Sequence, residues 1–258
     1  MLAEEKLKSL NKKGYFTINN LFTPEDTAIL SDARNRLVRT ANDLMIKSSS
    51  SNKANKAIER IDDSGSSFVY WNNRPKLVSW AGQSEPAFIY YGRDKRILEI
   101  VSEIFQHAQA QHLINQVHFK LPGVNDIYPL HLDIAHRQSR GWDSSVNDGV
   151  NYLQIAVALD LATEGNGTLR FLPGYIGPAD LKYDPREELN PKLYELSQPV
   201  ILRPGDAVFF TPYVPHGSGI NLTSRPRGLL INGFAYPGAC LSVDNYPGNG
   251  VGEMVKLK

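Results

Sequence analysis

The stretch Tyr128-Pro129-Leu130-His131-Leu132-Asp133 gives the first indication of how this chain is built. Side chains two residues apart on a β-strand point to the same face, so His131 and Asp133 would present an imidazole and a carboxylate together. A second stretch, Pro215-His216-Gly217-Ser218-Gly219-Ile220-Asn221, supplies another histidine. Two histidines and one carboxylate form the facial triad that holds non-haem Fe(II) with positions left open. An isolated H-x-D is often a chance match, so the surrounding sequence decides its meaning.

The sequence around both stretches predicts a series of short strands. Pro-Gly pairs that mark turns, at 122–123, 173–174 and 204–205, separate several of them. Many short strands divided by such turns are typical of a sandwich or jelly roll. The predicted strands cover residues 113–120, 128–133, 152–159, 168–172, 200–203, 207–211, 216–221 and 228–234.

The first hundred residues have a different pattern. Thr23 and Pro24, followed by acidic residues, are typical of a helix start, and apolar residues then recur at helical spacing up to Met45. A second helix is predicted from Asp94 to His107, a short strand over 14–22 and a polar loop over 47–66. We therefore expect a mainly β protein with N-terminal helices. Its single domain would comprise a helical support region (1–112), a jelly-roll core (113–236) and an irregular tail (237–258).

Composition narrows the class of partner. Lys and Arg number 28 and Asp and Glu 27, which gives a net charge of +1 and argues against nucleic acid or an anionic membrane as the main partner. The single cysteine, Cys240, excludes an internal disulfide framework and any multi-cysteine metal site. No apolar run approaches the roughly 18 residues of a membrane span, and the N-terminus has no apolar signal segment. We expect a cytoplasmic protein.

Strand parity suggests which faces line a cavity. Between 152 and 159, one face carries Tyr152, Gln154, Ala156 and Ala158, while the other carries large apolar residues. The large apolar face would pack under the N-terminal helices, and the small and polar face would leave room for ligands. Gln116, His118 and Lys120 likewise share a face. A polar strand face is often solvated, but several of them beside an apparent metal site favour a cavity.

Arg227 follows His216 by 11 positions and opens the next predicted strand. A guanidinium at the far end of a metal cavity suits a dicarboxylate, because it can bind one carboxylate through two parallel hydrogen bonds. Arg225, two residues earlier, has the same parity and is an alternative.

Together these motifs resemble the phytanoyl-CoA dioxygenase family of Fe(II)- and 2-oxoglutarate-dependent oxygenases. The resemblance is carried by H-x-D at 131–133, G-x-L-x-x-x-P-G at 167–174, and H-G-S-G-x-N at 216–221 with Arg227. It implies a double-stranded β-helix, the cupin-like jelly roll. It also implies iron ligation by His131, Asp133 and His216, and 2-oxoglutarate binding by Arg227 with help from Ser218.

Two further residues are candidate cosubstrate contacts. Lys120 is similar to the lysine of a K-P-G segment in ectoine hydroxylase relatives, although Leu121 is inserted here. Gln154 belongs to the predicted cavity face. Candidate substrate contacts combine amide, aromatic and cationic side chains: Gln116, Tyr70, Trp71, Arg74 and Trp142.

The activity that the resemblance implies is hydroxylation of a small molecule. The enzyme would use Fe(II) as cofactor, consume 2-oxoglutarate and O2, and release succinate and CO2. Asp133 argues against halogenation, because halogenating relatives lack the metal carboxylate. Two alternatives remain at this point. One is a cupin-like metalloenzyme that does not use 2-oxoglutarate, and the other is a non-catalytic jelly-roll binding module.

Overall fold

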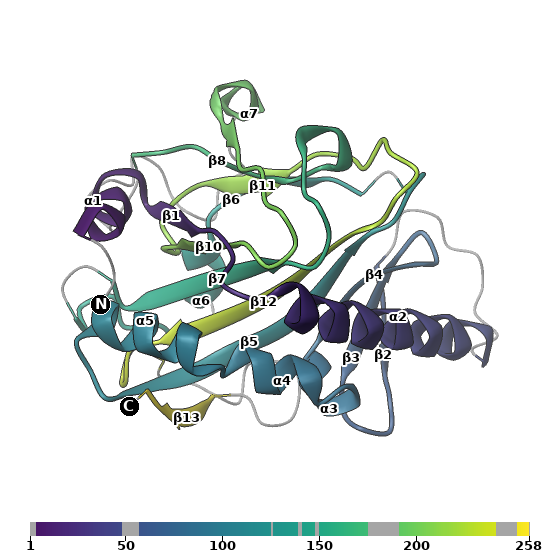
Figure 1. Ribbon diagram of the computed structural model, residues 1–258, viewed down its shortest axis with the longest axis horizontal. Coiled ribbons are helices and arrows are strands. Elements are labelled where there is room, and N and C mark those ends of the chain that lie inside the picture. The colour runs from purple at the N-terminus through teal and green to yellow at the C-terminus, as the bar shows by residue number, and fades with distance from the viewer. Residues whose placement is uncertain are drawn as a thin grey trace.

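The computed structural model describes residues 4–47, 57–124, 126–138, 141–147, 150–174, 191–240 and 252–257. In these ranges two antiparallel sheets face each other, and helices cover the outer face of the larger one (Figure 1). The expected jelly roll with N-terminal helices is confirmed. Because every strand pair is antiparallel, short turns suffice to join neighbouring strands.

The larger sheet has nine strands among the described residues, in the order β1-β10-β7-β12-β5-β4-β3-β2, with β13 also paired to β5. Their bounds are β1 (Tyr15–Ile18), β2 (Ala57–Ile61), β3 (Ser67–Trp71), β4 (Arg74–Ser79), β5 (Gln109–Lys120), β7 (Tyr152–Ala158), β10 (Ala207–Phe210), β12 (Arg227–Ala235) and β13 (Glu253–Lys256).

The smaller sheet runs β6-β11-β8-β9. It comprises β6 (Tyr128–His131), β8 (Leu169–Phe171), β9 (Gln198–Pro199) and β11 (His216–Ser218). The helices are α1 (Glu4–Lys13), α2 (Pro24–Lys47), α3 (Ala81–Ser84), α4 (Ala87–Gly92), α5 (Lys95–Phe105), α6 (Asp133–Gln138) and α7 (Leu193–Leu196), with a 3-10 turn η1 (Glu164–Asn166).

Alternation along β7 shows how the sequence separates two apolar layers. Leu153, Ile155 and Val157 belong to the cluster that packs under the helices. Ala156 and Ala158 point the other way, into the layer between the sheets. The expected division of this strand into a large apolar face and a small face is confirmed, and the small residues leave space between the sheets.

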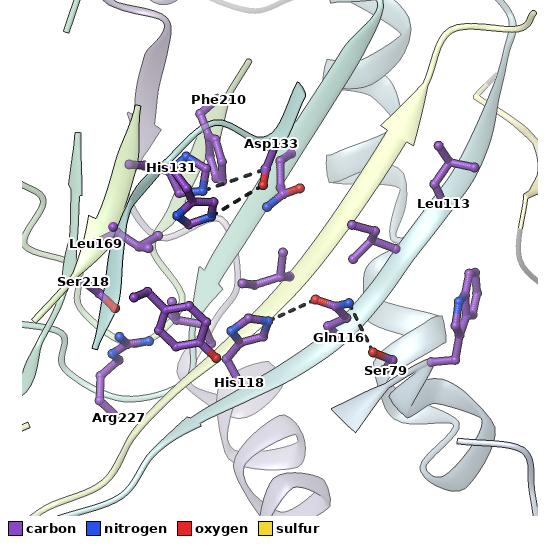
Figure 2. Close-up of a pocket in the computed structure, with 18 residues that line it drawn as sticks. Ser79, Leu113, Gln116, His118, His131, Asp133, Leu169, Phe210, Ser218 and Arg227 are labelled. Carbon is purple, nitrogen blue, oxygen red and sulfur yellow. Dashed lines mark hydrogen bonds and ion pairs between the residues drawn. The ribbon is translucent and has the colours of Figure 1, made fainter. Parts of the chain in front are cut away.

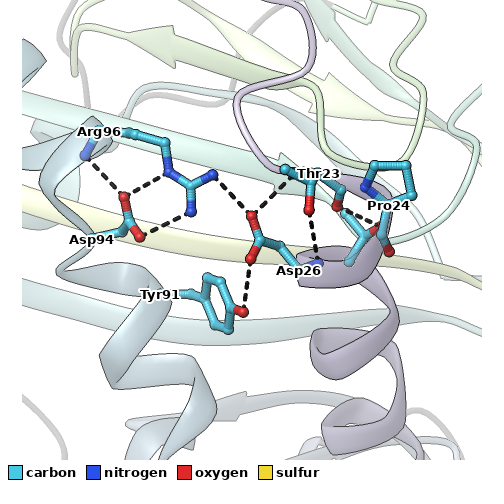
Figure 3. Close-up of polar contacts among 7 residues, drawn as sticks. Thr23, Pro24, Asp26, Tyr91, Asp94 and Arg96 are labelled. Atoms are coloured by element: carbon cyan, nitrogen blue, oxygen red, sulfur yellow. Dashed lines mark hydrogen bonds and ion pairs between the residues drawn. The ribbon is translucent and has the colours of Figure 1, made fainter.

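A polar cluster fixes the start of α2 against α4 and α5 (Figure 3). Thr23 and Asp26 form a capping box, in which Asp26 N donates to Thr23 Oγ1 (3.2 Å) and Thr23 N donates to Asp26 Oδ2 (3.0 Å). Arg96 joins Asp26 and Asp94 with contacts of 2.8 Å to each, and the Tyr91 hydroxyl donates to Asp26 at 2.9 Å. The predicted N-cap is confirmed, and the cluster holds the helical layer as one unit.

Some expected elements differ in the structure. The strand predicted over 128–133 ends at His131, and Asp133 begins helix α6 instead. The segment 200–203 forms only a bridge at Leu202. The predicted strand over 14–22 is shorter, Tyr15–Ile18.

The expected helical character of 1–112 is also incomplete, because strands β1 to β4 lie there and β5 begins there. Part of the predicted polar loop, Ala57–Ile61, is an edge strand with alternating exposure. Part of the predicted irregular tail, Glu253–Lys256, is a strand on β5. Both segments are short and polar, so their hydrophobic pattern is weak, and pairing with a neighbouring strand supplies their order. Residues 48–56 and 241–251 lie outside the described ranges.

No helix in the described ranges combines the length and the apolar character that crossing a membrane requires.

The turn before β10 makes a prediction about stability. Gly205 has φ +89°, and a Cβ there would lie 2.3 Å from the carbonyl oxygen of Phe22. Gly205→Ala should therefore lower the free energy of unfolding by about 2–4 kcal/mol, through backbone strain and displacement of the chain before α2. The measurement is chemical denaturation of both proteins.

Gly238 provides a matched control, because its φ is +88° and nothing lies within 4 Å of its Cβ position. Gly238→Ala should cost only the conformational strain, about 1 kcal/mol. Equal losses in the two variants would show that the contact with Phe22 is unimportant.

Candidate metal and cosubstrate site

The register between β6 and β11 places two histidines opposite each other. His216 pairs with His131, and their ring centroids are 4.4 Å apart. His131 Nδ1 lies 2.8 Å from the carbonyl oxygen of Pro129, and His216 Nδ1 lies 3.1 Å from that of Val214. A carbonyl only accepts, so each Nδ1 must carry the hydrogen. In the neutral ring this tautomer leaves the lone pair on Nε2, which is the atom that can bind a metal.

Asp133 completes the group from the first residue of α6. Its Oδ1 lies 3.8 Å from His131 Nε2, and its Oδ2 lies 3.8 Å from His216 Nε2. One ligand atom from each of the three residues lies within 4.8 Å of the others. Buried neighbours fix this position, since Leu132 and Ile134 are packed and Ile134 N donates to the carbonyl of Pro212. The same-face argument for His131 and Asp133 is wrong in its geometry, although the two residues do meet.

The three side chains border a cavity of about 240 Å³ between the sheets (Figure 2). This volume is below the usual 300–1,000 Å³ of drug-sized sites, so it suits a small cosubstrate and a small substrate. The cavity is lined by Ser79, Trp80, Leu113, Ile114, Gln116, His118, Tyr128, His131, Asp133, Gln154, Leu169, Phe210, His216, Gly217, Ser218, Arg227, Leu229 and Ile231.

Arg227 lies at the end of the cavity that Tyr128 and Ser218 also line. It is 3% exposed, and burial lowers its pKa to about 10. One guanidinium nitrogen donates to the carbonyl oxygen of Gly167 at 2.5 Å, while Nε is buried without a hydrogen-bond partner. The hydroxyl of Tyr128 is likewise buried without a partner. Two buried unpaired donors beside a cavity indicate a place for an acceptor ligand.

Gly167 makes this arrangement possible. Its φ is +72°, and a Cβ there would lie 2.3 Å from the carbonyl oxygen of Gly219. Only glycine adopts this conformation in this space without strain, and the conformation directs the Gly167 carbonyl to Arg227.

Positive charge accumulates around Arg227. Lys120 is its cross-strand neighbour and donates to the carbonyl oxygen of Asp126, while Lys76 pairs with the Asp126 carboxylate at 2.8 Å. Lys76 also lies 4.0 Å from the ring centroid of Tyr128. Burial, and then repulsion from Arg227, lowers the pKa of Lys120 to about 7. Three cations therefore surround one carboxylate, which leaves this end short of negative charge.

His118 remains neutral within this group. Burial, with repulsion from nearby cations, lowers its pKa to about 3. Its Nε2 lies 3.0 Å from Gln116 Oε1, and Gln116 Nε2 donates to Ser79 Oγ at 3.2 Å. A hydrogen-bonded row thus crosses one wall of the cavity (Figure 2).

The structure brings together most of the residues predicted to form the site. His131, Asp133, His216, Arg227, Ser218, Gln154 and Gln116 all line the cavity. Lys120 lies beside Arg227 as its cross-strand partner but is not among the residues that line the cavity, so we expect its effect on a ligand to be electrostatic. Arg225 is exposed, and its carbonyl oxygen accepts a hydrogen bond from Asn221. Of the two arginines, Arg227 is therefore the candidate for binding the carboxylate of 2-oxoglutarate.

Four candidate substrate contacts lie elsewhere. Tyr70 is in the core, where its hydroxyl donates to the carbonyl of Ala41, and Trp142 packs against Tyr152 in a separate apolar cluster. Trp71 and Arg74 lie where β3 meets β4, outside the cavity lining. The expectation that these residues line the cavity is wrong, because an aromatic residue on a strand can face either apolar layer.

Sequence reasoning missed Ser79, Trp80 and Tyr128 as lining residues. Ser79 and Trp80 reach the cavity only because β4 pairs with β5, which no local pattern reveals. Tyr128 had a usable signal, since it lies three residues before His131 in the metal-binding stretch.

The model of the family described as phytanoyl-CoA dioxygenase (PhyH) matches residues 10–229. The chain belongs to the phytanoyl-CoA dioxygenase family. This membership confirms the resemblance and agrees with the two-histidine, one-carboxylate group.

Two curated relatives of this family member are similar over part of their lengths. A methylphosphonate hydroxylase of Gimesia maris is 35% identical over 82 residues, which cover 31% of this chain and 32% of the relative. A 2-aminoethylphosphonate dioxygenase of Uncultured bacterium HF130_AEPn_1 is 30% identical over 133 residues, which cover 51% of this chain and 47% of the relative. The matches therefore span less than half of either relative.

Solved structures show the same fold at low identity. EctD from S. alaskensis with 2-oxoglutarate and 5-hydroxyectoine has a TM-score of 0.76 and 15% identity, covering 99% of this chain and 86% of EctD. The α-ketoglutarate-dependent epimerase SnoN from nogalamycin biosynthesis has a TM-score of 0.65 and 17% identity, covering 98% of this chain and 90% of SnoN.

Proposed function

We propose that this protein is a non-haem Fe(II)- and 2-oxoglutarate-dependent oxygenase that hydroxylates a small molecule. The observation that carries the proposal is the pairing of two sites in one cavity. A two-histidine, one-carboxylate group lies on its wall, and a buried arginine with an unpaired Nε lies at its end. Family membership supports the same activity.

The donor set fits iron. Two neutral imidazole Nε2 atoms and one carboxylate form the facial arrangement that non-haem Fe(II) oxygenases use, and both imidazoles are oriented by backbone carbonyls. His131, Asp133 and His216 would hold the metal. Bound iron, with 2-oxoglutarate and O2, supplies the conversion of C–H to C–OH, while 2-oxoglutarate is oxidised to succinate and CO2.

The far end of the cavity fits a dicarboxylate. Arg227 and Tyr128 offer buried unpaired donors, and Ser218 lies beside them. Lys76 is balanced by Asp126 and Asp160 by Arg34, so Arg227, and Lys120 in its protonated form, have no carboxylate of their own to balance them. A dicarboxylate would balance them. In a metalloenzyme that does not use 2-oxoglutarate, nothing would balance these charges. Their presence therefore favours the 2-oxoglutarate-dependent oxygenase over the cupin-like alternative.

The substrate is a small molecule in this proposal, and organophosphonates are the first class to test. The two curated relatives are named for methylphosphonate and 2-aminoethylphosphonate.

Arg227→Ala should raise the dissociation constant of 2-oxoglutarate at least tens-fold, because it removes a charge-assisted contact at a buried carboxylate. The affinity for Fe(II) should stay within about twofold, since Arg227 does not belong to the metal group. Anaerobic titration, with binding followed by calorimetry, measures both quantities.

Arg225→Ala is the matched control, because Arg225 is exposed and two residues away. It should leave 2-oxoglutarate affinity unchanged. A strong loss in Arg225→Ala, or none in Arg227→Ala, would contradict the assignment of the cosubstrate end.

The affinity for 2-oxoglutarate should also depend on pH. The pKa of Lys120 is lowered to about 7, and a bound dicarboxylate would stabilise its charged form. Affinity should therefore be constant below pH 7 and fall as the pH rises above it, by about three- to tenfold up to pH 8.5. His118, whose pKa is about 3, stays neutral throughout this range.

Lys120→Met should remove this dependence and bind 2-oxoglutarate with the weaker affinity that wild type shows at high pH. Titrations of both proteins at pH 6, 7 and 8.5 provide the comparison. A dependence of equal size in the variant would exclude Lys120 as its source.

A further inference from the structure

The cavity extends beyond the end occupied by Arg227. Strands β12, β5 and β7 lie side by side in the sheet on this side of the cavity, and their residues pair in successive rows. In one row Arg227 pairs with Lys120. Six residues further along β12, Gly233 pairs with both Ile114 and Gln154. At about 3.3 Å per residue, these rows are on the order of 20 Å apart along the strand. A five-carbon dicarboxylate bound at Arg227 is far shorter than this. Gln154 therefore faces the part of the cavity left for the substrate.

Gln154 is near the metal group as well. It pairs with Phe210 across β7 and β10, and the Phe210 ring lies 4.8 Å from the ring of His216. Gln154 and Asp133 both line the cavity. An amide at this place can contact a molecule bound on the open side of the metal group.

A neighbouring tyrosine fixes the orientation of this amide. The hydroxyl of Tyr152 donates to Gln154 Oε1 at 2.7 Å, and both residues are buried on the inner face of β7. Because Oε1 is the atom held by Tyr152, the two N–H groups of the amide are directed elsewhere. No residue in the described ranges accepts a hydrogen bond from them. They are available to an acceptor in the cavity.

Gly233 provides the space that Tyr152 needs. A Cβ at this position would lie 2.0 Å from the Tyr152 hydroxyl oxygen and 2.8 Å from Cζ. Glycine inside a strand is unfavourable and often marks a close approach of another group. Here it allows the Tyr152 hydroxyl to reach under β12 and hold Gln154.

Three apolar residues also contribute to this end of the cavity. Trp80, Leu113 and Ile114 line it. Trp80 has φ 53° and ψ 45°, a left-handed conformation that is rare for a bulky residue. The Ser66 hydroxyl donates to its carbonyl oxygen at 2.7 Å, and its indole packs edge-on against His112 at 5.5 Å. Strain kept at a residue that borders a cavity is typical of functional sites.

We propose that Gln154, held by Tyr152 in the space left by Gly233, binds an oxygen of the substrate beside the metal. The substrate class is then a small oxyanion, such as a phosphonate, whose apolar carbon lies against Ile114, Leu113 and Trp80. This inference rests on the proposed function. Gln154 becomes a substrate contact in place of a cosubstrate contact, and Tyr152 becomes a positioning residue.

The test uses the whole chain described here with Fe(II) and 2-oxoglutarate under anaerobic conditions, and methylphosphonate as the probe. Methylphosphonate binding is followed by its effect on the visible absorption of the iron–2-oxoglutarate complex. Tyr152→Phe removes only the hydroxyl. It should keep the dissociation constant of 2-oxoglutarate within about twofold and raise that of methylphosphonate about tenfold or more, because Gln154 is no longer held in the orientation that directs its N–H groups to the anion.

Two further variants complete the test. Tyr213→Phe also removes a buried tyrosine hydroxyl, from a residue in the same apolar cluster as Tyr152 that does not line the cavity, and should change neither constant. Gln154→Glu keeps the volume and the acceptor for Tyr152 but places a negative charge beside the probe. It should abolish methylphosphonate binding while 2-oxoglutarate binding persists. Thermal melting checks that each variant is folded.

Unchanged methylphosphonate affinity in Tyr152→Phe would overturn the inference, and so would an equal loss of 2-oxoglutarate affinity. A wild-type complex that binds 2-oxoglutarate but responds to neither methylphosphonate nor 2-aminoethylphosphonate would overturn the substrate class while leaving the proposed function intact. Failure of wild type to form the iron–2-oxoglutarate complex would instead contradict the proposed function itself.

Discussion

The antiparallel register of β6 and β11 is the constraint on which the site depends. It sets His131 opposite His216, and each ring is oriented by a carbonyl two residues before it in the chain. The chain then turns after β6 and begins α6 with Asp133, which brings the carboxylate to both rings. A slip of one residue in this pairing would turn every side chain of the strand to the opposite face and separate the group.

A second constraint is the positive charge buried at one end of the same cavity. Arg227 and Lys120 are paired across β12 and β5, away from solvent, where burial lowers the pKa of both. Buried cations are costly unless they are paired, so the fold accepts a stability cost at this end of the cavity. A ligand of opposite charge would remove that cost, and binding would then stabilise the folded protein. The small residues of β7 provide the necessary space between the sheets.

The sequence predicts the parts that depend on local patterns. Strand alternation separates the two faces of β7, turn residues separate the strands, and the H-x-D and H-G-S-G-x-N stretches identify the metal group. It does not predict the contribution of Trp80, which depends on pairing between distant strands and on a backbone conformation. The sequence also does not predict where Tyr70 and Trp142 pack. A jelly roll with helices has two apolar layers, and strand alternation does not say which layer an aromatic side chain enters. Asp133 reaches its place through a helix that the two-residue spacing did not reveal.

The central claim is that His131, Asp133 and His216 hold iron for 2-oxoglutarate, and Asp133 tests it most directly. Wild type, Asp133→Ala and, as a control outside the metal group, Asp143→Ala are titrated anaerobically with Fe(II) and then with 2-oxoglutarate, and the visible charge-transfer absorption is recorded. Wild type and Asp143→Ala should bind one equivalent of iron and develop the band. Asp133→Ala should lose iron affinity by about 100-fold or more and show no band, because the only anionic ligand is gone. Unchanged iron affinity and an unchanged band in Asp133→Ala would contradict the account.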